Sequence, residues 1–128
     1  MKIENLLGKA AQATASARLL LDSGDTDGAC NRAYYAMFDA ARAALLTCDI
    51  PPESVRTHNG LIAAFSLHFV KTGQVSVDLG KSLNKAEDLR LIADYKGDLI
   101  EHDDAAWVVE VAQEFVDAIH VLVSGRAR

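Results

Sequence analysis

The sequence is poor in the residues that break helices. Its 128 residues include only 2 prolines and 8 glycines, whereas half are apolar. Proline and glycine are the residues that disfavour a helix interior most strongly, so their scarcity leaves long helical stretches open. A chain of this length also buries enough surface to fold without a metal or a disulfide. We therefore expect one all-α domain spanning residues 1–128.

Cysteine and long apolar runs are scarce as well. The two cysteines, Cys30 and Cys48, lie at opposite ends of one predicted helix, about 27 Å apart by helical rise, so they cannot form an intrachain disulfide. The N-terminus lacks the apolar core of a signal peptide, and no run approaches the roughly 20 apolar residues of a membrane span. Free thiols and the lack of both signals favour a cytoplasmic protein with no membrane association.

Positive charge is in deficit, with 13 Lys and Arg against 18 Asp and Glu and a net charge of −5. Such a surface does not attract a polyanion as a whole, so any nucleotide or RNA site has to be a local basic pocket. Metal motifs are sparse too, because Asp117-x-x-His120 occurs once and a di-metal bundle needs paired motifs. We expect neither a metal nor a cofactor.

The apolar residues that are present recur at helical spacing and predict about five helices in an up-and-down bundle. The first, second, third and fifth predicted helices span about 3–21, 26–47, 58–69 and 103–123. The fourth starts at Ser76 or Asp78 and ends between Tyr95 and Gly97. The expected N-terminal caps are Asp25 or Thr26 for the second helix, Thr57 for the third, and Ser76 or Asp78 for the fourth. Gly24 is expected to end the first helix. The segment Asp49-Ile50-Pro51-Pro52 is expected to stop the second helix, and Lys71-Thr72-Gly73 the third.

The second predicted helix has two chemically different faces. At about 100° per residue, one face carries apolar residues and the other carries Arg32, Tyr35, Asp39 and Arg42. The apolar face comprises Tyr34, Met37, Phe38, Ala41 and Leu45. The polar ribbon fits either an ordinary solvated face or a ligand-contacting surface in which a tyrosine stacks on a base.

Arg90 conflicts with its surroundings, because it falls on the apolar stripe of the fourth helix near Leu79 and Leu83. A guanidinium there is costly unless it is paired. It can be paired with Asp39 or another carboxylate, or can extend to water. Alternatively it lies inward without a neutralising carboxylate and contacts an anionic ligand.

His58 stands at the start of the third predicted helix, where the helix dipole favours a neutral imidazole. A neutral histidine can act there as a base or a hydrogen-bond donor. The alternative is a histidine that is hydrogen-bonded within the packed interface.

Four segments together resemble the small stand-alone prokaryotic HEPN-domain proteins, over about residues 3–123. They are the stretch from Asn31 to Leu46, Thr57-His58-Asn59-Gly60-Leu61, Phe69-Val70-Lys71-Thr72-Gly73, and Ala86-x-x-x-Arg90-x-x-Ala93-Asp94-Tyr95. The resemblance implies a bundle with a four-helix core that forms homodimers. It also implies a toxin–antitoxin pairing with a minimal nucleotidyltransferase.

Many members of that family are metal-independent ribonucleases with an Arg-x4-6-His motif, in which arginine holds the phosphate and histidine assists attack. Arg90 corresponds to that arginine, but the histidine slots hold Tyr95, Lys96 and Gly97. Asp94 and Tyr95 stand in that neighbourhood, and His102 is distant in sequence. Loss of the base is expected to slow cleavage by about two to four orders of magnitude.

Three functions follow from these residues. The first is a homodimeric binding module for a nucleotide, RNA or a partner protein, with contacts from Arg32, Tyr35, Asp39, His58, Arg90, Asp94 and Tyr95. The second is a ribonuclease in which His58 or His102 replaces the missing histidine. The third is a structural or antitoxin-like dimer in which an Arg90–Asp39 pair sets the register. The last helix and the small residues Ala36, Ala40 and Ala43 fit a dimer contact, and they fit an ordinary core as well.

Overall fold

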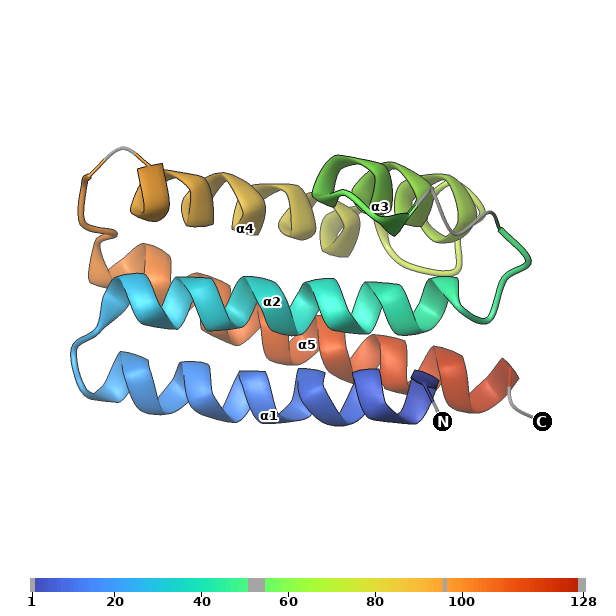
Figure 1. The fold of residues 1–128 in the computed structure, drawn as a ribbon, viewed down its shortest axis with the longest axis horizontal. Helices are drawn as coiled ribbons and strands as arrows, with labels where there is room; N and C mark the ends of the chain where they lie inside the picture. The colour runs from blue at the N-terminus through green and yellow to red at the C-terminus, as the bar shows by residue number, and fades with distance from the viewer. Residues whose placement is uncertain (1, 51–54, 96, 127–128) are drawn as a thin grey trace.

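The computed structural model describes residues 2–50, 55–95 and 97–126, and within them the chain is all-α (Figure 1). The helices are α1 (Lys2–Asp22), α2 (Thr26–Leu45), α3 (His58–Phe65), α4 (Val77–Tyr95) and α5 (His102–Arg126), with a π-helical turn, η2 (Ser66–Val70), after α3. The four long helices run alternately up and down, and α3 with η2 lies beside the start of α4 (Figure 1). The predicted helical bundle is confirmed.

Local signals set most helix ends. Asp25 caps α2 by accepting a hydrogen bond from Gly28 N, and Thr57 caps α3 by accepting one from Gly60 N. Ser76 Oγ accepts from Leu79 N at the start of α4. Gly24 has a φ of 91°, a left-handed conformation that favours glycine and lets the chain reverse after α1. These predicted caps are confirmed, whereas Pro51 and Pro52 lie outside the described residues.

One predicted helix boundary is wrong, and the third helix, which is helical through Phe69 as predicted, changes its geometry before that point. The second helix ends at Leu45 rather than near Thr47, because the next turn tightens into bonds from Thr47 N to Ala44 O and from Cys48 N to Leu45 O. The third helix does not continue regularly to Phe69. From Ser66 its turns widen, and Lys71 N bonds to Ser66 O, five residues back.

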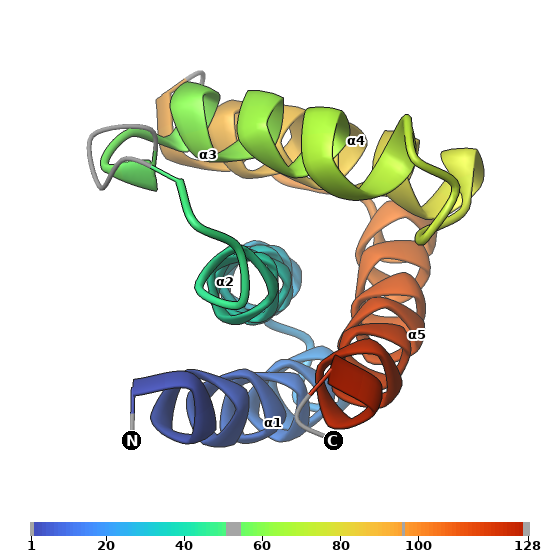
Figure 2. The ribbon, with the colours of Figure 1, turned by 90° about the vertical axis from the view of Figure 1, so that its right-hand side faces the viewer.

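Helix α2 is the centre of the bundle and packs against α1, α3, α4 and α5 (Figure 2). Its alanines let neighbouring helices approach closely, and Ala36, Ala40 and Ala43 are fully buried inside the chain. The apolar arc of α5, including Val108, is buried there as well. Of the two interpretations of these surfaces, the ordinary core is confirmed and the dimer contact is wrong, because the core of a single chain already uses them.

Candidate functional site around Arg90 and His58

Arg90 lies inward from α4 and is only 7% exposed. Its Nη2 is 3.3 Å from Glu87 Oε1, and its Nη1 donates to Asp94 Oδ2 at 2.9 Å. The inward orientation is as predicted. The expectation of a guanidinium without a carboxylate nearby is wrong. The alternative, pairing with Asp39 or another carboxylate, is confirmed in its second form. Residues three before and four after Arg90 on the same helix face neutralise it instead of Asp39.

The guanidinium also packs on aromatic rings of α2. Its central carbon is 5.1 Å from the ring centroid of Tyr34 and 5.7 Å from that of Tyr35, within cation–π range. Burial is the largest single influence and disfavours the charged form, but Glu87, Tyr35 and Tyr34 together outweigh it, and the pKa of Arg90 is raised above its ordinary value. Arg90 therefore stays charged and fixes how α4 sits against α2.

His58 begins α3 and meets the same cluster from the other side. Its Nδ1 is 2.6 Å from the hydroxyl of Tyr34 and 3.9 Å from Glu87 Oε2, and the tautomer decides which atom of the first pair donates. Its ring packs against Phe38, with ring centroids 4.7 Å apart. The His58 side chain is 37% exposed, so it is the point where this buried polar chain reaches solvent.

The Tyr34 hydroxyl connects these groups. Burial, followed by the hydrogen bond and charge of Glu87, raises the pKa of Tyr34 far above its ordinary value, so the phenol keeps its proton. Arg90, Glu87, Tyr34 and His58 consequently form one continuous chain of polar contacts between α4, α2 and α3. We call these four residues the Arg90 cluster. Its three buried members, Arg90, Glu87 and Tyr34, hold the His58 ring in one orientation.

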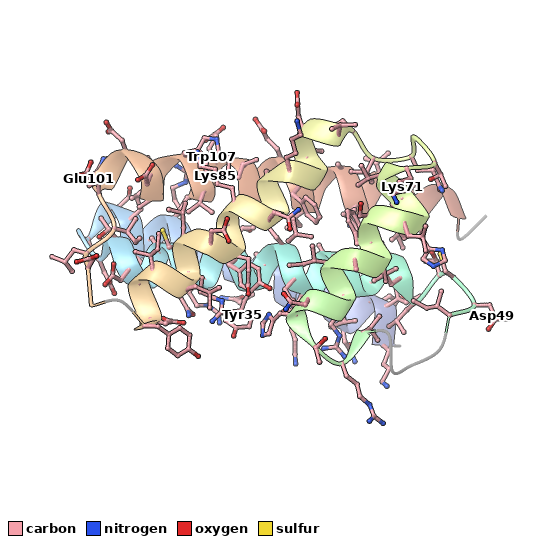
Figure 3. All side chains as sticks on the ribbon, turned by 90° about the horizontal axis from the view of Figure 1, so that it is seen from above. Tyr35, Asp49, Lys71, Lys85, Glu101 and Trp107 are labelled. Carbon is pink, nitrogen blue, oxygen red and sulfur yellow. The ribbon has the colours of Figure 1, made fainter. Side chains whose placement is uncertain are left out.

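A hollow of about 330 Å³ lies next to the cluster, between α1 and α2. It is lined by Lys9, Gln12, Arg32, Tyr35 and Asp39. Burial raises the pKa of Asp39, while Arg42, Lys9 and Arg32 act to lower it. Tyr35, labelled in Figure 3, connects the hollow to the Arg90 cluster, because its ring contacts Arg90 and also lines the hollow.

The chain matches the model of the HEPN domain over residues 3–122, nearly its whole length. It belongs to the HEPN domain family. A "UPF0332 protein" of Thermotoga maritima is 36% identical, covering 98% of this chain and 94% of the relative. Two Methanocaldococcus jannaschii proteins are also similar. "Putative toxin MJ0605" is 34% identical, and the match covers 92% of this chain and 86% of the relative. "Putative toxin MJ0142" is 31% identical, and the match covers 91% of this chain and 78% of the relative.

Two of the predicted site residues of this HEPN domain lie apart from the cluster. Tyr95 is 76% exposed at the end of α4. The His102 side chain is 68% exposed at the start of α5, where its Nδ1 is 3.9 Å from Asp103 Oδ1. The structure brings together Tyr35, His58, Arg90 and Asp94, with Arg32 and Asp39 in the adjoining hollow.

Sequence reasoning missed Glu87 and the polar role of Tyr34. The spacing of Glu87 three residues before Arg90 signals an ion pair on one helix face. Tyr34 was predicted to pack, and it does, but a buried phenol also needs a hydrogen-bond partner. Both signals are present in the sequence.

The described residues hold no group of three or more His, Cys, Asp or Glu side chains that could bind a metal ion. Within the same part of the HEPN chain, no helix is both long enough and apolar enough to cross a membrane.

Proposed function

We propose that this HEPN protein is a component of a toxin–antitoxin-type pair and works as a homodimeric, cytoplasmic module that binds a nucleotide or a short RNA. Its partner in this proposal is a nucleotidyltransferase. Membership of the HEPN family and the relatives named as putative toxins support the toxin-like part. The nucleotide-binding part rests on the site.

The hollow beside the Arg90 cluster carries the proposal. It places the Tyr35 ring in one lining with Lys9 and Arg32. An aromatic side chain can stack on a base, and adjacent cations can contact its phosphate. In a chain with a net charge of −5, such a local arrangement is what a nucleotide requires.

Arg90 has a different part in this proposal. Its donors are directed at Glu87 and Asp94, so it serves as a positioning residue that holds Tyr35 and, through Glu87 and Tyr34, His58. His58 then offers a half-exposed imidazole at the edge of the site. Asp94, whose side chain is partly exposed, completes the pairing of Arg90 and so helps to hold it in place.

Calorimetric titration with mononucleotides, dinucleotides and short RNAs tests the proposal. We expect Arg32→Gln and Tyr35→Leu each to weaken binding about tenfold or more, because each removes a charged or stacking contact. Arg18→Gln is the matched control, since Arg18 pairs with Glu110 on an exposed surface away from the hollow. Absence of binding, or equal binding by both variants and the parent, contradicts the proposal.

A ribonuclease with a non-standard site is the second candidate, and the contact of His58 with Tyr34 favours it. A histidine oriented by a buried hydroxyl is suited to act as a general base. Incubation of labelled RNA with purified protein in EDTA separates the two functions. A binding module leaves the RNA intact, whereas cleavage that is lost in both His58→Gln and Tyr34→Phe assigns catalysis to His58.

A further inference from the structure

A separate cleft of about 430 Å³ lies at the other end of α2, between the start of α1 and the described residues 46–50 and 55–56. Figure 1 shows that the first turn of α1 and the last turn of α2 lie at the same end of the bundle. Phe38, Leu45, Ile50 and Val55 supply much of its wall. Its volume and apolar lining fall within the range of small-molecule sites.

Of the charged side chains that the structure describes, those that line this cleft are Lys2, Arg42 and Arg56, which are all cations, and no described carboxylate lines it. Acidic residues outnumber basic ones in the chain, 18 to 13, so composition alone does not produce such a lining. Among the described residues, none of these three cations lies within 4.0 Å of a carboxylate oxygen. The nearest acidic group on the same helix, Asp39, lines the other hollow.

We propose that this cleft binds a small organic anion, with an apolar acyl or aryl body against Phe38 and Ile50 and a carboxylate or phosphate head against Arg42 and Arg56. The apolar wall excludes water from the body of the ligand, and a half-buried guanidinium forms charge-assisted hydrogen bonds with its head. The inference does not depend on the proposed nucleotide site. Arg32 and Arg42 are about 15 Å apart along α2 by helical rise.

Cys48 gives a direct readout, because its half-buried thiol lines the cleft. The other cysteine, Cys30, is fully buried, and burial followed by the charge of Asp27 raises its pKa to about 12. A thiol reagent therefore modifies Cys48 first. Decanoate and decyl phosphate are expected to slow this modification in a saturable way, and comparison of the two identifies the preferred head group.

Decanol and decylammonium share the chain but lack the negative charge, and we expect them to protect Cys48 at least about tenfold less well. Arg42→Gln and Arg56→Gln are each expected to raise the half-protecting concentration of decanoate about tenfold, with Arg18→Gln as the unchanged control. Circular dichroism verifies that each variant folds, and Arg56 is exposed, so its substitution spares the core.

Equal protection by decanol, or unchanged protection in both arginine variants, overturns the proposal. So does a lack of protection at millimolar decanoate. A dimer in which Cys48 is unreactive without any ligand also overturns it, because a second copy of the chain then covers the cleft. Failure of nucleotide binding in the calorimetric experiment leaves these outcomes unaffected.

Discussion

The two sides of α2 are built from different kinds of residue. Towards α1 and α5 the buried positions are small and apolar, including Ala33, Ala36 and Ala40, and they belong to one core cluster with Phe115 of α5. On the side towards α4, Glu87 and Arg90 of α4 are buried beside apolar residues such as Leu83. The guanidinium of Arg90 packs on the Tyr34 ring of α2. One interface is dry and close-packed, whereas the other contains a paired guanidinium.

The two interfaces contribute differently to the stability of the bundle and to the orientation of its side chains. Apolar burial is non-directional and stabilises a fold roughly in proportion to area, so the α2–α5 side tolerates changes that conserve volume. A buried ion pair gains little net energy after desolvation, but it allows few geometries. The α2–α4 side therefore fixes the positions of Tyr35 and His58 more than it stabilises the bundle.

The apolar side should give the largest loss of stability. Phe115 is fully buried and its ring centroid is 5.3 Å from that of Phe65. Phe115→Ala is expected to lower the free energy of unfolding by about 3–5 kcal/mol, because it removes buried area and leaves a cavity. Urea denaturation measures the change. Leu67→Ala, at an exposed position, is the control, and similar losses in both variants would contradict the assignment of this core.

The charged side should respond differently to single and double changes. Glu87→Gln leaves Asp94 as the one remaining carboxylate partner of Arg90 among the described residues and is expected to lower the free energy of unfolding by about 3 kcal/mol. Glu87→Leu combined with Arg90→Met removes the buried charges and should restore stability to within about 1 kcal/mol of the parent. The same urea experiment compares them.

Nucleotide affinity, measured on the same variants, adds a second readout to this test. If Arg90 acts through position, the stable double variant still loses nucleotide affinity, because Tyr35 and His58 are no longer held. A double variant as unstable as Glu87→Gln would mean that the pair stabilises the bundle and would remove the contrast between the two sides.

Raising the pH tests the apolar side of α2 through the buried thiol of Cys30, and the expected change in stability is smaller. Burial raises the pKa of Cys30 from 9.0 to about 12, so above pH 9 the unfolded chain loses this proton before the folded one. Stability then falls as pH rises, by at most about 1.4 kcal/mol per pH unit from this group. Thermal unfolding from pH 8 to 10 should show a shallower fall in Cys30→Ala than in Cys48→Ala. Parallel curves would contradict the burial of this thiol.

Much of the fold was predictable because its signals are local. The caps at Asp25, Thr57 and Ser76 depend on hydrogen bonds that reach three residues along the chain. The stripe of α5 follows helical periodicity alone. The π-helical turn at Ser66–Val70 was not predictable in this way. It accompanies the packing of Phe65 and Phe69 in the core, where both are buried and their ring centroids are 5.4 Å apart, and local periodicity does not reveal this packing.

The candidate site was only partly predictable. Arg90 was identified because a guanidinium on an apolar stripe breaks a local rule, and that signal needs no tertiary information. Its contacts with Tyr34 and Tyr35, and the approach of His58, join residues separated by dozens of positions. The cationic cleft at the end of α2 was missed for the same reason, because Lys2, Arg42 and Arg56 come from distant segments.

The sequence by itself determined an all-α bundle of HEPN type, the positions of most helix ends, and the inward orientation of Arg90, because periodicity and capping act over a few residues. Only the tertiary structure decided which groups surround that guanidinium and where the hollows lie. Helix packing sets those distances, and a side chain on one helix acquires its neighbours on another only after the core has closed.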